Sequence, residues 1–306
     1  MERIYIVGAG SIGKALAVFL QRAGREVTLV RGRSNSNGAT SQSLEVEVNS
    51  TTVRAEVKTM DLEHLANAKG IVVVTVKSFG NKRVAASLNP AIGNPIVLLQ
   101  NGLGVEEPFI HYHHPTIYRC VLFVTSQLLE SGAVRFKPVA PCPVGILHGT
   151  NERLLEIVSL LSTPDFQFVP APDIQKIVWE KAIMNTVFNS ICPLLEIDNG
   201  VFYRETAALE LARSIITAGV RIAASQGLVV NAHEIETGLL RISRSSAGQF
   251  ISTLQDIRQG RPTEIETLNF ALKEIALAAG LKNETYEIGL LGELTRLKAR
   301  LNQKEA

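Results

Sequence analysis

The stretch RIYIVGAGSIG, at residues 3–13, decides the fold of the first part of the chain. Its first five residues, apolar after Arg3, are typical of a buried strand, and the apolar spacing of residues 11–23 predicts an amphipathic helix. Between them lies a glycine-rich turn with Gly8, Gly10 and Gly13. Gly8 permits a tight turn, Gly10 lets the backbone approach a pyrophosphate, and Gly13 lets the helix pack on the strand.

This strand–turn–helix context predicts a dinucleotide site, although a glycine-rich turn without a ligand is the alternative. Ser11 and Ile12, at the helix N-terminus, are expected to join the glycines in holding the pyrophosphate. The second expected strand, residues 26–30, is followed by Arg31 and Arg33, where NAD-selective proteins usually have Asp or Glu. Positive charge there favours NADP over NAD, unless the arginines are only surface residues.

Outward from this stretch, short apolar segments alternate with helical segments as far as about residue 170. The alternation predicts an α/β fold with an N-terminal Rossmann-type, doubly wound and mostly parallel sheet. Three prolines between residues 164 and 172 mark its end, so we expect an N-terminal domain at 1–169 and an all-α domain at 170–306. The further strands are expected at 71–76, 96–99 and 119–125, a strand or hairpin at 44–58, a short helix at 61–68, and the later helices at 173–195, 206–225, 233–243, 263–279 and 285–303.

Composition limits the class of protein. Hydrophobic residues make up 46% and charged residues 20% of the 306 residues, which excludes a disordered, collagen-like or coiled-coil chain. The net charge of +2 does not indicate binding to nucleic acid or to a membrane surface. Cys120, Cys142 and Cys192 lack the spacing of a zinc site or a disulfide framework, and neither a membrane span nor a signal peptide can be recognised. We therefore expect a cytoplasmic protein with reduced thiols and no metal.

Polar residues follow two of the expected strands. Lys77 follows the strand at 71–76, and Asn101 lies two residues after the strand at 96–99. Because open α/β sheets bind ligands outside the carboxyl ends of their strands, both side chains are expected near the cofactor. A solvated lysine and a turn-forming Asn-Gly pair explain them equally well.

A line of polar residues crosses an apolar helix of the second domain. Lys181, Asn185 and Asn189 are four residues apart, so they share one helix face. Polar side chains on a buried helix need partners. Either a substrate or a hydrogen-bond network between helices satisfies this need, and the pattern favours neither.

The segment from Ser252 to Glu264 is also polar. Pro262 followed by Thr263 and Glu264 is typical of a helix start, in which Glu264 is a carboxylate favoured by the helix dipole. Local salt bridges and caps are the simpler interpretation of Gln255, Asp256 and Arg261.

Together these motifs resemble the ketopantoate reductases, also called 2-dehydropantoate 2-reductases. The resemblance covers nearly the whole chain in the right order, and the two C-terminal motifs are more specific than the glycine turn. The motifs are Gly8-x-Gly10-x-x-Gly13, Arg31, Val76-Lys77-Ser78, Leu99-Gln100-Asn101-Gly102, Trp179-x-Lys181-x-x-x-Asn185-x-x-x-Asn189, Ser252-x-x-Gln255-Asp256 and Thr263-Glu264-Ile265-Glu266-x-x-Asn269.

The resemblance implies an NADP(H)-binding domain, a helical substrate and catalytic domain, and an active site in the cleft between them. It implies NADPH-dependent reduction of 2-dehydropantoate to pantoate, on the path to pantothenate and coenzyme A. Lys181 would be the proton donor, and Glu264 the second catalytic group, in contact with the cofactor. The positions that would contact substrate are Asn101, Lys181, Asn185, Asn189 and Ser252, and Lys77 and Asn101 would contact the cofactor.

Some positions differ from the family pattern. Gly80 stands where many members have Gln, and Gln249 stands where Asn is common. Because Gln249 is expected near the substrate, an NADP-dependent reductase of another branched or aromatic 2-oxo acid is the main alternative. A non-catalytic dinucleotide sensor is a further alternative.

Three other features have simpler interpretations. His111, His113 and His114 lack the helix-face spacing of a metal site. Arg241 and Arg244 form a basic cluster, which is either a solvated helix face or a contact for the substrate carboxylate. The helical domain offers a surface for a homodimer, although no apolar heptad can be read in it.

Overall fold

The structure, a computed structural model, describes residues 2–32 and 40–305. Arg33, considered above for cofactor selectivity, lies outside these residues. The chain forms two compact units: unit 1 comprises Met1–Gln100 and Val105–Ile174, and unit 2 comprises Asn101–Gly104 and Gln175–Ala306. Among the described residues, no helix combines the length and apolar character needed to cross a membrane.

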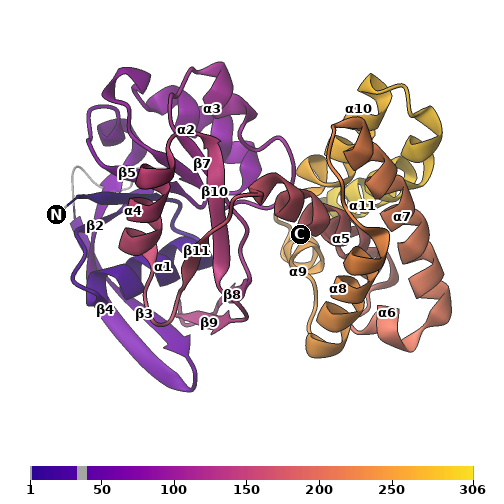
Figure 1. Ribbon diagram of the computed structural model, residues 1–306. Helices are drawn as coiled ribbons and strands as arrows, with labels where there is room; N and C mark the ends of the chain where they lie inside the picture. The colour runs from indigo at the N-terminus through magenta and orange to yellow at the C-terminus, as the bar shows by residue number, and fades with distance from the viewer. Residues whose placement is uncertain (1, 33–39, 306) are drawn as a thin grey trace. The chain divides into compact units, whose positions relative to one another are not determined.

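Unit 1 is built on one mixed sheet, in which the described residues contribute eleven strands (Figure 1). Their order is β11-β10-β7-β6-β5-β1-β2-β4-β3-β9-β8. β1 lies between β2 and β5, so the winding of the parallel part reverses beside β1, where doubly wound sheets bind ligands. The parallel strands are β1 (Ile4–Val7), β2 (Val27–Arg31), β4 (Thr51–Asp61), β5 (Ile71–Val74), β6 (Ile96–Leu98) and β7 (Ile117–Cys120).

The remaining strands extend both edges of the sheet. β3 (Thr40–Val48) forms an antiparallel hairpin with β4, and β9 (Val134–Pro138) and β8 (Val124–Leu128) continue beyond it. On the other edge, β10 (Cys142–His148) is antiparallel to β7 and parallel to β11 (Phe168–Pro170).

Two local expectations for this unit are wrong. The helix expected at 61–68 is only a 3-10 turn, η1 (Leu62–Leu65), because β4 continues to Asp61, which pairs with Arg31 of β2. The strand expected at 119–125 consists of the ends of two strands, β7 and β8. Residues 121–123 separate them, because Val121 and Phe123 donate their N–H groups to the region of β10 instead.

Both faces of the parallel strands are buried, as expected for a sheet that helices cover on two sides. Ile4 and Ile6 of β1 belong to the apolar cluster that includes residues of α1 (Ser11–Arg22) and α4 (Asn151–Leu161). Tyr5 and Val7 point to the opposite cluster, with residues of α2 (Asn81–Ser87) and α3 (Glu107–His111). The apolar runs that predicted the strands are thus explained by burial of alternate residues on opposite faces.

Unit 2 is helical, and two of its helices pack closely on α5 (Ile174–Leu195). Gly219 of α7 and Gly238 of α8 lie directly against α5, since a Cβ added at these glycines would be 2.8 Å from Ile183 and 3.2 Å from Met184. This close packing explains why α5 is apolar around most of its circumference. The helices, drawn from maroon to yellow in Figure 1, are α5 (Ile174–Leu195), α6 (Val201–Arg204), α7 (Thr206–Ser225), α8 (Ala232–Ser245), α9 (Ser252–Arg258), α10 (Asn269–Ala278) and α11 (Thr285–Glu305).

The single helix expected at 263–279 is wrong. A 3-10 turn, η4 (Ile265–Thr267), is separated from α10 by Leu268, whose ψ of −93° interrupts the helix. The interruption lets the Thr267 carbonyl accept the N–H of Leu103 at 2.8 Å. Glu264 therefore directly precedes a 3-10 turn and is not in the first turn of an α-helix.

Candidate functional site

The glycine turn between β1 and α1 is held by a threonine that the sequence motif does not include. Thr75, just after β5, donates its hydroxyl to the carbonyls of Gly8 and Val7, at 3.0 and 3.2 Å. Gly8 has a φ of +126°, and a Cβ at Gly13 would be 1.9 Å from the Gly8 carbonyl oxygen. The fold itself therefore requires glycine at positions 8 and 13.

Gly10 differs from these two glycines. Its φ of −76° and ψ of −174° suit any residue, and no atom of the described residues lies within 4 Å of a Cβ built there. Gly10 is the N-cap residue of α1, and the first turn of this helix has no acidic residue. The first backbone hydrogen bond of the helix runs from the Lys14 N–H to the Gly10 carbonyl. The preceding N–H groups are left for an anion. These residues therefore fit a pyrophosphate, because the space beside Gly10 would admit it.

The other two predicted residues of this turn take different parts. The Ser11 hydroxyl donates to the Ser126 carbonyl of β8 at 3.1 Å, so the side chain is used within unit 1. Ile12 packs its side chain against the apolar cluster under α1. At both positions the backbone N–H is the group available to a cofactor.

Arg31 lies at the carboxyl end of β2, where the sequence predicted a contact to a 2′-phosphate. Its Nη2 donates to Oε1 of Gln42 on β3 at 3.2 Å, which orients the half-buried guanidinium. Lys14, the fourth residue of α1, has a pKa that is lowered by burial and, to a smaller extent, by the positive charge of Arg31. Two cations close enough to disfavour each other form a site suited to an anion. Sequence reasoning missed Lys14, because only the fold brings α1 and the end of β2 together.

Lys77 lies just beyond β5, at the carboxyl edge of the sheet. It is half-buried and directly precedes the 3-10 turn η2 (Ser78–Gly80), where its carbonyl accepts the Gly80 N–H at 2.9 Å. β5 pairs with β1 on one side and β6 on the other. The strand that leads to Lys77 is therefore next to the strand that leads to the glycine turn.

In unit 2 the structure brings the Asn101 loop and the Glu264 segment together. The Leu103 N–H donates to the Thr267 carbonyl at 2.8 Å. Gly102 has a φ of +94° and lies so close to Thr267 that a Cβ added to it would be 2.5 Å from the Thr267 oxygens. Asn101 and Glu264 are both half-buried. Although Asn101 and Glu264 are 163 residues apart in the sequence, the segments that carry them pack against each other.

The polar face of α5 is tied to α9. Lys181 and Asn185 are half-buried, and Asn189 is 4% exposed. The Asn189 Oδ1 accepts the hydroxyl of Thr253 at 2.7 Å, and its Nδ2 donates to the Asn185 carbonyl at 2.9 Å. Of the two interpretations of this face, the network between helices is therefore present at Asn189.

Ser252, the neighbour of Thr253, is exposed at the first position of α9. The chain beyond α9 is fixed by Arg261, which pairs with the buried carboxylate of Asp256 at 2.8 Å and donates its N–H to the Asp256 carbonyl at 2.8 Å. The local salt bridge expected from the sequence is confirmed. It anchors the segment that leads to Glu264.

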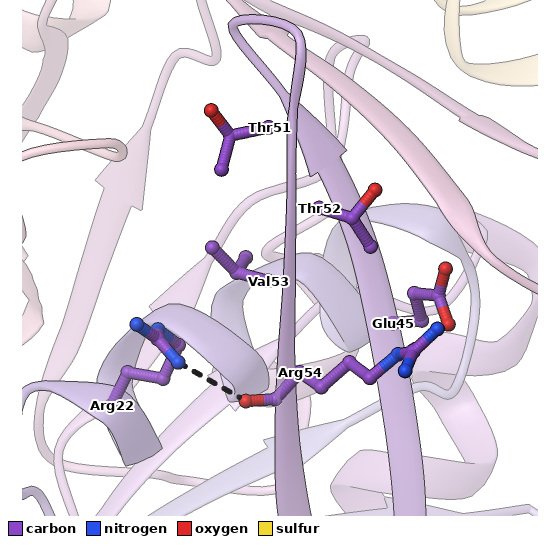
Figure 2. Close-up of a pocket in the computed structure, with 6 residues that line it drawn as sticks. All are labelled: Arg22, Glu45, Thr51, Thr52, Val53 and Arg54. Atoms are coloured by element: carbon purple, nitrogen blue, oxygen red, sulfur yellow. Dashed lines mark hydrogen bonds and ion pairs between the residues drawn. The ribbon is translucent and has the colours of Figure 1, made fainter.

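Two surface hollows lie apart from these residues. The first, under the β3–β4 hairpin, is lined by Arg22, Glu45, residues 51–53 and Arg54 (Figure 2). The Arg54 guanidinium is paired with Glu45 at 2.7 Å, and the Arg54 carbonyl accepts a hydrogen bond from Arg22. Arg22 is the last residue of α1, so at the usual helical rise it lies about 18 Å along the helix from Gly10. The second involves only α8, around Arg241 and Arg244. Among the described residues, no group of three or more His, Cys, Asp or Glu side chains is arranged to hold a metal.

A doubly wound sheet with a glycine turn beside its switch point is the architecture of dinucleotide-binding proteins. Residues 4–147 match the family described as ketopantoate reductase PanE/ApbA, and residues 173–296 match the C-terminal domain of the same family. The chain belongs to the ketopantoate reductase family.

One curated relative agrees with this placement, and two solved structures share the fold. The 2-dehydropantoate 2-reductase of Halobacterium salinarum is 28% identical over 282 residues, which cover 90% of this chain and 92% of that protein. A D-mandelate dehydrogenase solved with NADH and anilino(oxo)acetate has a TM-score of 0.83 and 19% identity, over 98% of this chain and 99% of that one. A dimeric ketopantoate reductase from Staphylococcus aureus has a TM-score of 0.81 and 18% identity, with the same two coverages.

Proposed function

We propose that the protein reduces 2-dehydropantoate to pantoate with NADPH, a step toward pantothenate and coenzyme A. The observation that carries this proposal is the clustering in unit 2. There the Asn101 loop lies on the Glu264 segment, and the polar face of α5 is tied to the helix that begins with Ser252. Family membership adds the substrate class. We assign cofactor binding to residues 1–169, and substrate binding and catalysis to residues 170–306 together with Asn101.

The cofactor assignment uses the residues of unit 1. Gly8, Gly10, Gly13 and the N–H groups of Ser11 and Ile12 would hold the pyrophosphate, and Lys77 would contact the cofactor near the end of β5. Arg31, with Lys14 beside it, would hold the 2′-phosphate, which supports NADPH over NADH. When bound, the reduced nicotinamide supplies a hydride to the ketone carbon of the substrate.

Lys181 is assigned the role of proton donor. Its ammonium would hydrogen-bond the ketone oxygen and stabilise the negative charge that develops there. It would then transfer a proton to that oxygen, which completes the hydroxyl of the product. Glu264 would hydrogen-bond at the reacting centre and to the cofactor. Asn185 and Ser252 would bind the acid, and Asn189 would hold α9 in place through Thr253.

The test is NADPH oxidation measured with 2-dehydropantoate, 2-oxoisovalerate and an aromatic 2-oxo acid. We expect 2-dehydropantoate to be among the best substrates by kcat/KM. Turnover of another acid with no measurable turnover of 2-dehydropantoate would contradict the proposed substrate and leave the reductase chemistry intact. Nucleotide binding without turnover of any acid would favour the sensor.

A reductase of another 2-oxo acid is the second candidate, and two observations favour it. The D-mandelate dehydrogenase, whose name indicates an aromatic hydroxy acid, shares the fold over nearly the whole chain. Gln249 also lies three residues before Ser252, and its carbonyl accepts the Asn199 N–H at 2.9 Å. Replacement of Gln249 by Asn should shift the substrate panel toward 2-dehydropantoate if this position selects the acid.

We also propose that the protein forms a homodimer through α11. Its exposed apolar residues are Tyr286, Leu290, Leu294, Leu297 and Leu301, each at least 40% exposed. At the helical repeat of about 100° per residue they fall within an arc of about 80°. An apolar stripe of this kind suits a second copy of itself, and the S. aureus relative is described as dimeric.

Light scattering after size-exclusion chromatography, over a series of protein concentrations, tests the dimer. The double variant Leu294→Glu with Leu297→Glu should be monomeric. The control, Leu211→Glu on α7, changes a leucine that is 55% exposed and should remain dimeric. A monomeric wild-type protein, or a double variant that is still dimeric, would exclude this interface.

A further inference from the structure

A buried arginine, Arg119, lies on β7 and contacts Gln100, the residue that directly precedes Asn101. Arg119 is 2% exposed, although its side chain is charged. It is paired in register with Leu98, the last residue of β6. Ile117, two residues earlier on β7 and therefore on the same face of the strand, belongs to the apolar cluster on the α2 and α3 side. A charge in such a place is stable only if it is paired and hydrogen-bonded. Its contacts therefore indicate what it does.

Arg119 contacts the chain where β6 has ended. Its Nη1 donates to the backbone carbonyl of Gln100 at 2.7 Å, and its Nε lies 3.6 Å from the Glu106 carboxylate, which is 17% exposed. β6 ends at Leu98, so strand pairing has stopped before Gln100. The guanidinium thus supplies a donor to this carbonyl beyond the end of the strand.

A second set of contacts joins the two ends of the loop. Gln100 donates its side-chain amide to Oδ1 of Asn81 at 2.6 Å, and Asn81 donates from Nδ2 to the Val105 carbonyl at 2.7 Å. Gln100 and Val105 are the residues on either side of Asn101–Gly104. Arg119 and Asn81 therefore hold both ends of the loop from within unit 1, and both side chains are almost completely buried.

We propose that Arg119 is a positioning residue for nucleotide binding, which acts through the Gln100 carbonyl on the adjacent Asn101. The inference rests on the proposed contact between Asn101 and the cofactor, and it adds a residue that makes no such contact itself. A planar, permanently charged group suits this place, because it can donate to the Gln100 carbonyl and pair with the Glu106 carboxylate at the same time. An apolar side chain of similar size would fill the same volume but leave the Gln100 carbonyl without this donor.

A double-mutant cycle tests the inference, with the dissociation constant for NADPH measured by nucleotide fluorescence and no 2-oxo acid present. We expect Arg119→Met to weaken NADPH binding about tenfold, and Asn101→Ala to weaken it by at least as much. In the Asn101→Ala background, Arg119→Met should add less than about twofold, because residues that act through one another are not additive. Arg119→Lys, which retains a charged donor, should recover most of the lost affinity.

Three outcomes would overturn the inference: full additivity of the two substitutions, an unchanged dissociation constant in folded Arg119→Met, or no recovery with Lys. Arg54→Met is the control, since this arginine is exposed on the β3–β4 hairpin. If Arg119→Met does not fold, Arg119→Gln, which keeps a polar side chain but loses the charged donor, replaces it in the same cycle with the same expected non-additivity.

The measurement also separates this inference from the proposed function. Failure of the wild-type protein to bind either nicotinamide dinucleotide would contradict the cofactor assignment itself. Wild-type binding with an additive cycle would leave that assignment intact and remove only the role of Arg119. In a steady-state assay the expected pattern is a raised KM for NADPH with kcat retained, which general loss of folded protein would not produce.

Discussion

The glycine turn of unit 1 and the polar face of α5 in unit 2 are both short repeated motifs, but they are built differently. The turn is made of backbone: Gly8 and Gly13 are required because other backbone atoms occupy the space of a side chain. The face of α5 is made of side chains, and Asn189 joins it to α9 through one hydrogen bond. In each motif the fold uses at least one position, whereas we propose that a neighbour, Gly10 or Asn185, meets a ligand. Motif membership alone therefore does not distinguish a residue that holds the structure from one that meets a ligand.

The largest effect is expected at Lys181, the charged end of the α5 face. Lys181→Ala should lower kcat by about 100-fold or more, because it removes both the proton donor and a cation at the developing alkoxide. NADPH affinity should change little. Lys176→Ala, on the same helix, is the matched control, since Lys176 is paired with Glu180 at 3.7 Å. An unchanged kcat in Lys181→Ala would remove the catalytic assignment.

A pair of alanine variants distinguishes the glycine that is proposed to contact the cofactor from the glycine that the fold requires. Gly10→Ala should fold normally and weaken NADPH binding by about tenfold or more, since it loses about 1.4 kcal/mol of contact with the pyrophosphate. Gly13→Ala should lower the free energy of unfolding by about 3 kcal/mol, because its Cβ would meet the Gly8 carbonyl. Thermal melts and nucleotide titrations of both proteins give the comparison. Equal loss of stability in the two variants would show that the fold also needs Gly10.

Cofactor selectivity depends on the end of β2. Arg31→Ala should raise KM for NADPH about tenfold and leave KM for NADH nearly unchanged, because only NADPH has the 2′-phosphate. Both constants are measured in the same assay. If the wild-type protein prefers NADH, or if both constants rise together, Arg31 does not select the cofactor.

A matched pair of alanine variants likewise tests the two asparagines on the polar face of α5. Asn189→Ala should lower the free energy of unfolding by about 1–2 kcal/mol, because it leaves the buried Thr253 hydroxyl without its acceptor. Asn185→Ala should affect stability less and instead raise KM for the 2-oxo acid. Denaturant unfolding with Thr253→Val as the second substitution isolates the Asn189 contact. Additive losses would show that the two side chains act independently.

The smallest effect concerns pH. Burial and the charge of Arg31 lower the pKa of Lys14, so it loses its proton at a lower pH than an exposed lysine does. As pH rises through that pKa, the site loses positive charge and NADPH should bind about threefold more weakly. Binding of NADH should not follow this change. Lys14→Gln should make the NADPH titration independent of pH in the same range, and a profile unaffected by this substitution would exclude Lys14.

The fold was predictable where a pattern is continuous in sequence. Apolar runs such as 71–74 predicted buried parallel strands, and the glycine-rich turn between a strand and a helix predicted a dinucleotide site. The helix expected from residue 263 failed because Thr267 bonds to Leu103, a residue far away in the chain. Such a contact leaves no periodic pattern in the local sequence.

The candidate site follows the same rule. Lys181, Asn185 and Asn189 could be grouped from their spacing, because one helix carries all three. Thr75 and Lys14 could not be found, since their importance comes from the elements that the fold places beside them. The apolar stripe of α11 was also not recognised, because its intervals of four, four, three and four residues do not follow a strict heptad and exposure cannot be read from spacing.

The short segment Asn101–Gly104 has a consequence for protein engineering. It interrupts unit 1 in sequence but is a part of unit 2, held by Thr267. A recombinant fragment that starts at residue 175 would lack these four residues and leave the Thr267 carbonyl without the Leu103 donor. A chimera that takes its helical part from a relative must therefore also take the relative's version of this loop, or it will combine two surfaces that were never selected together.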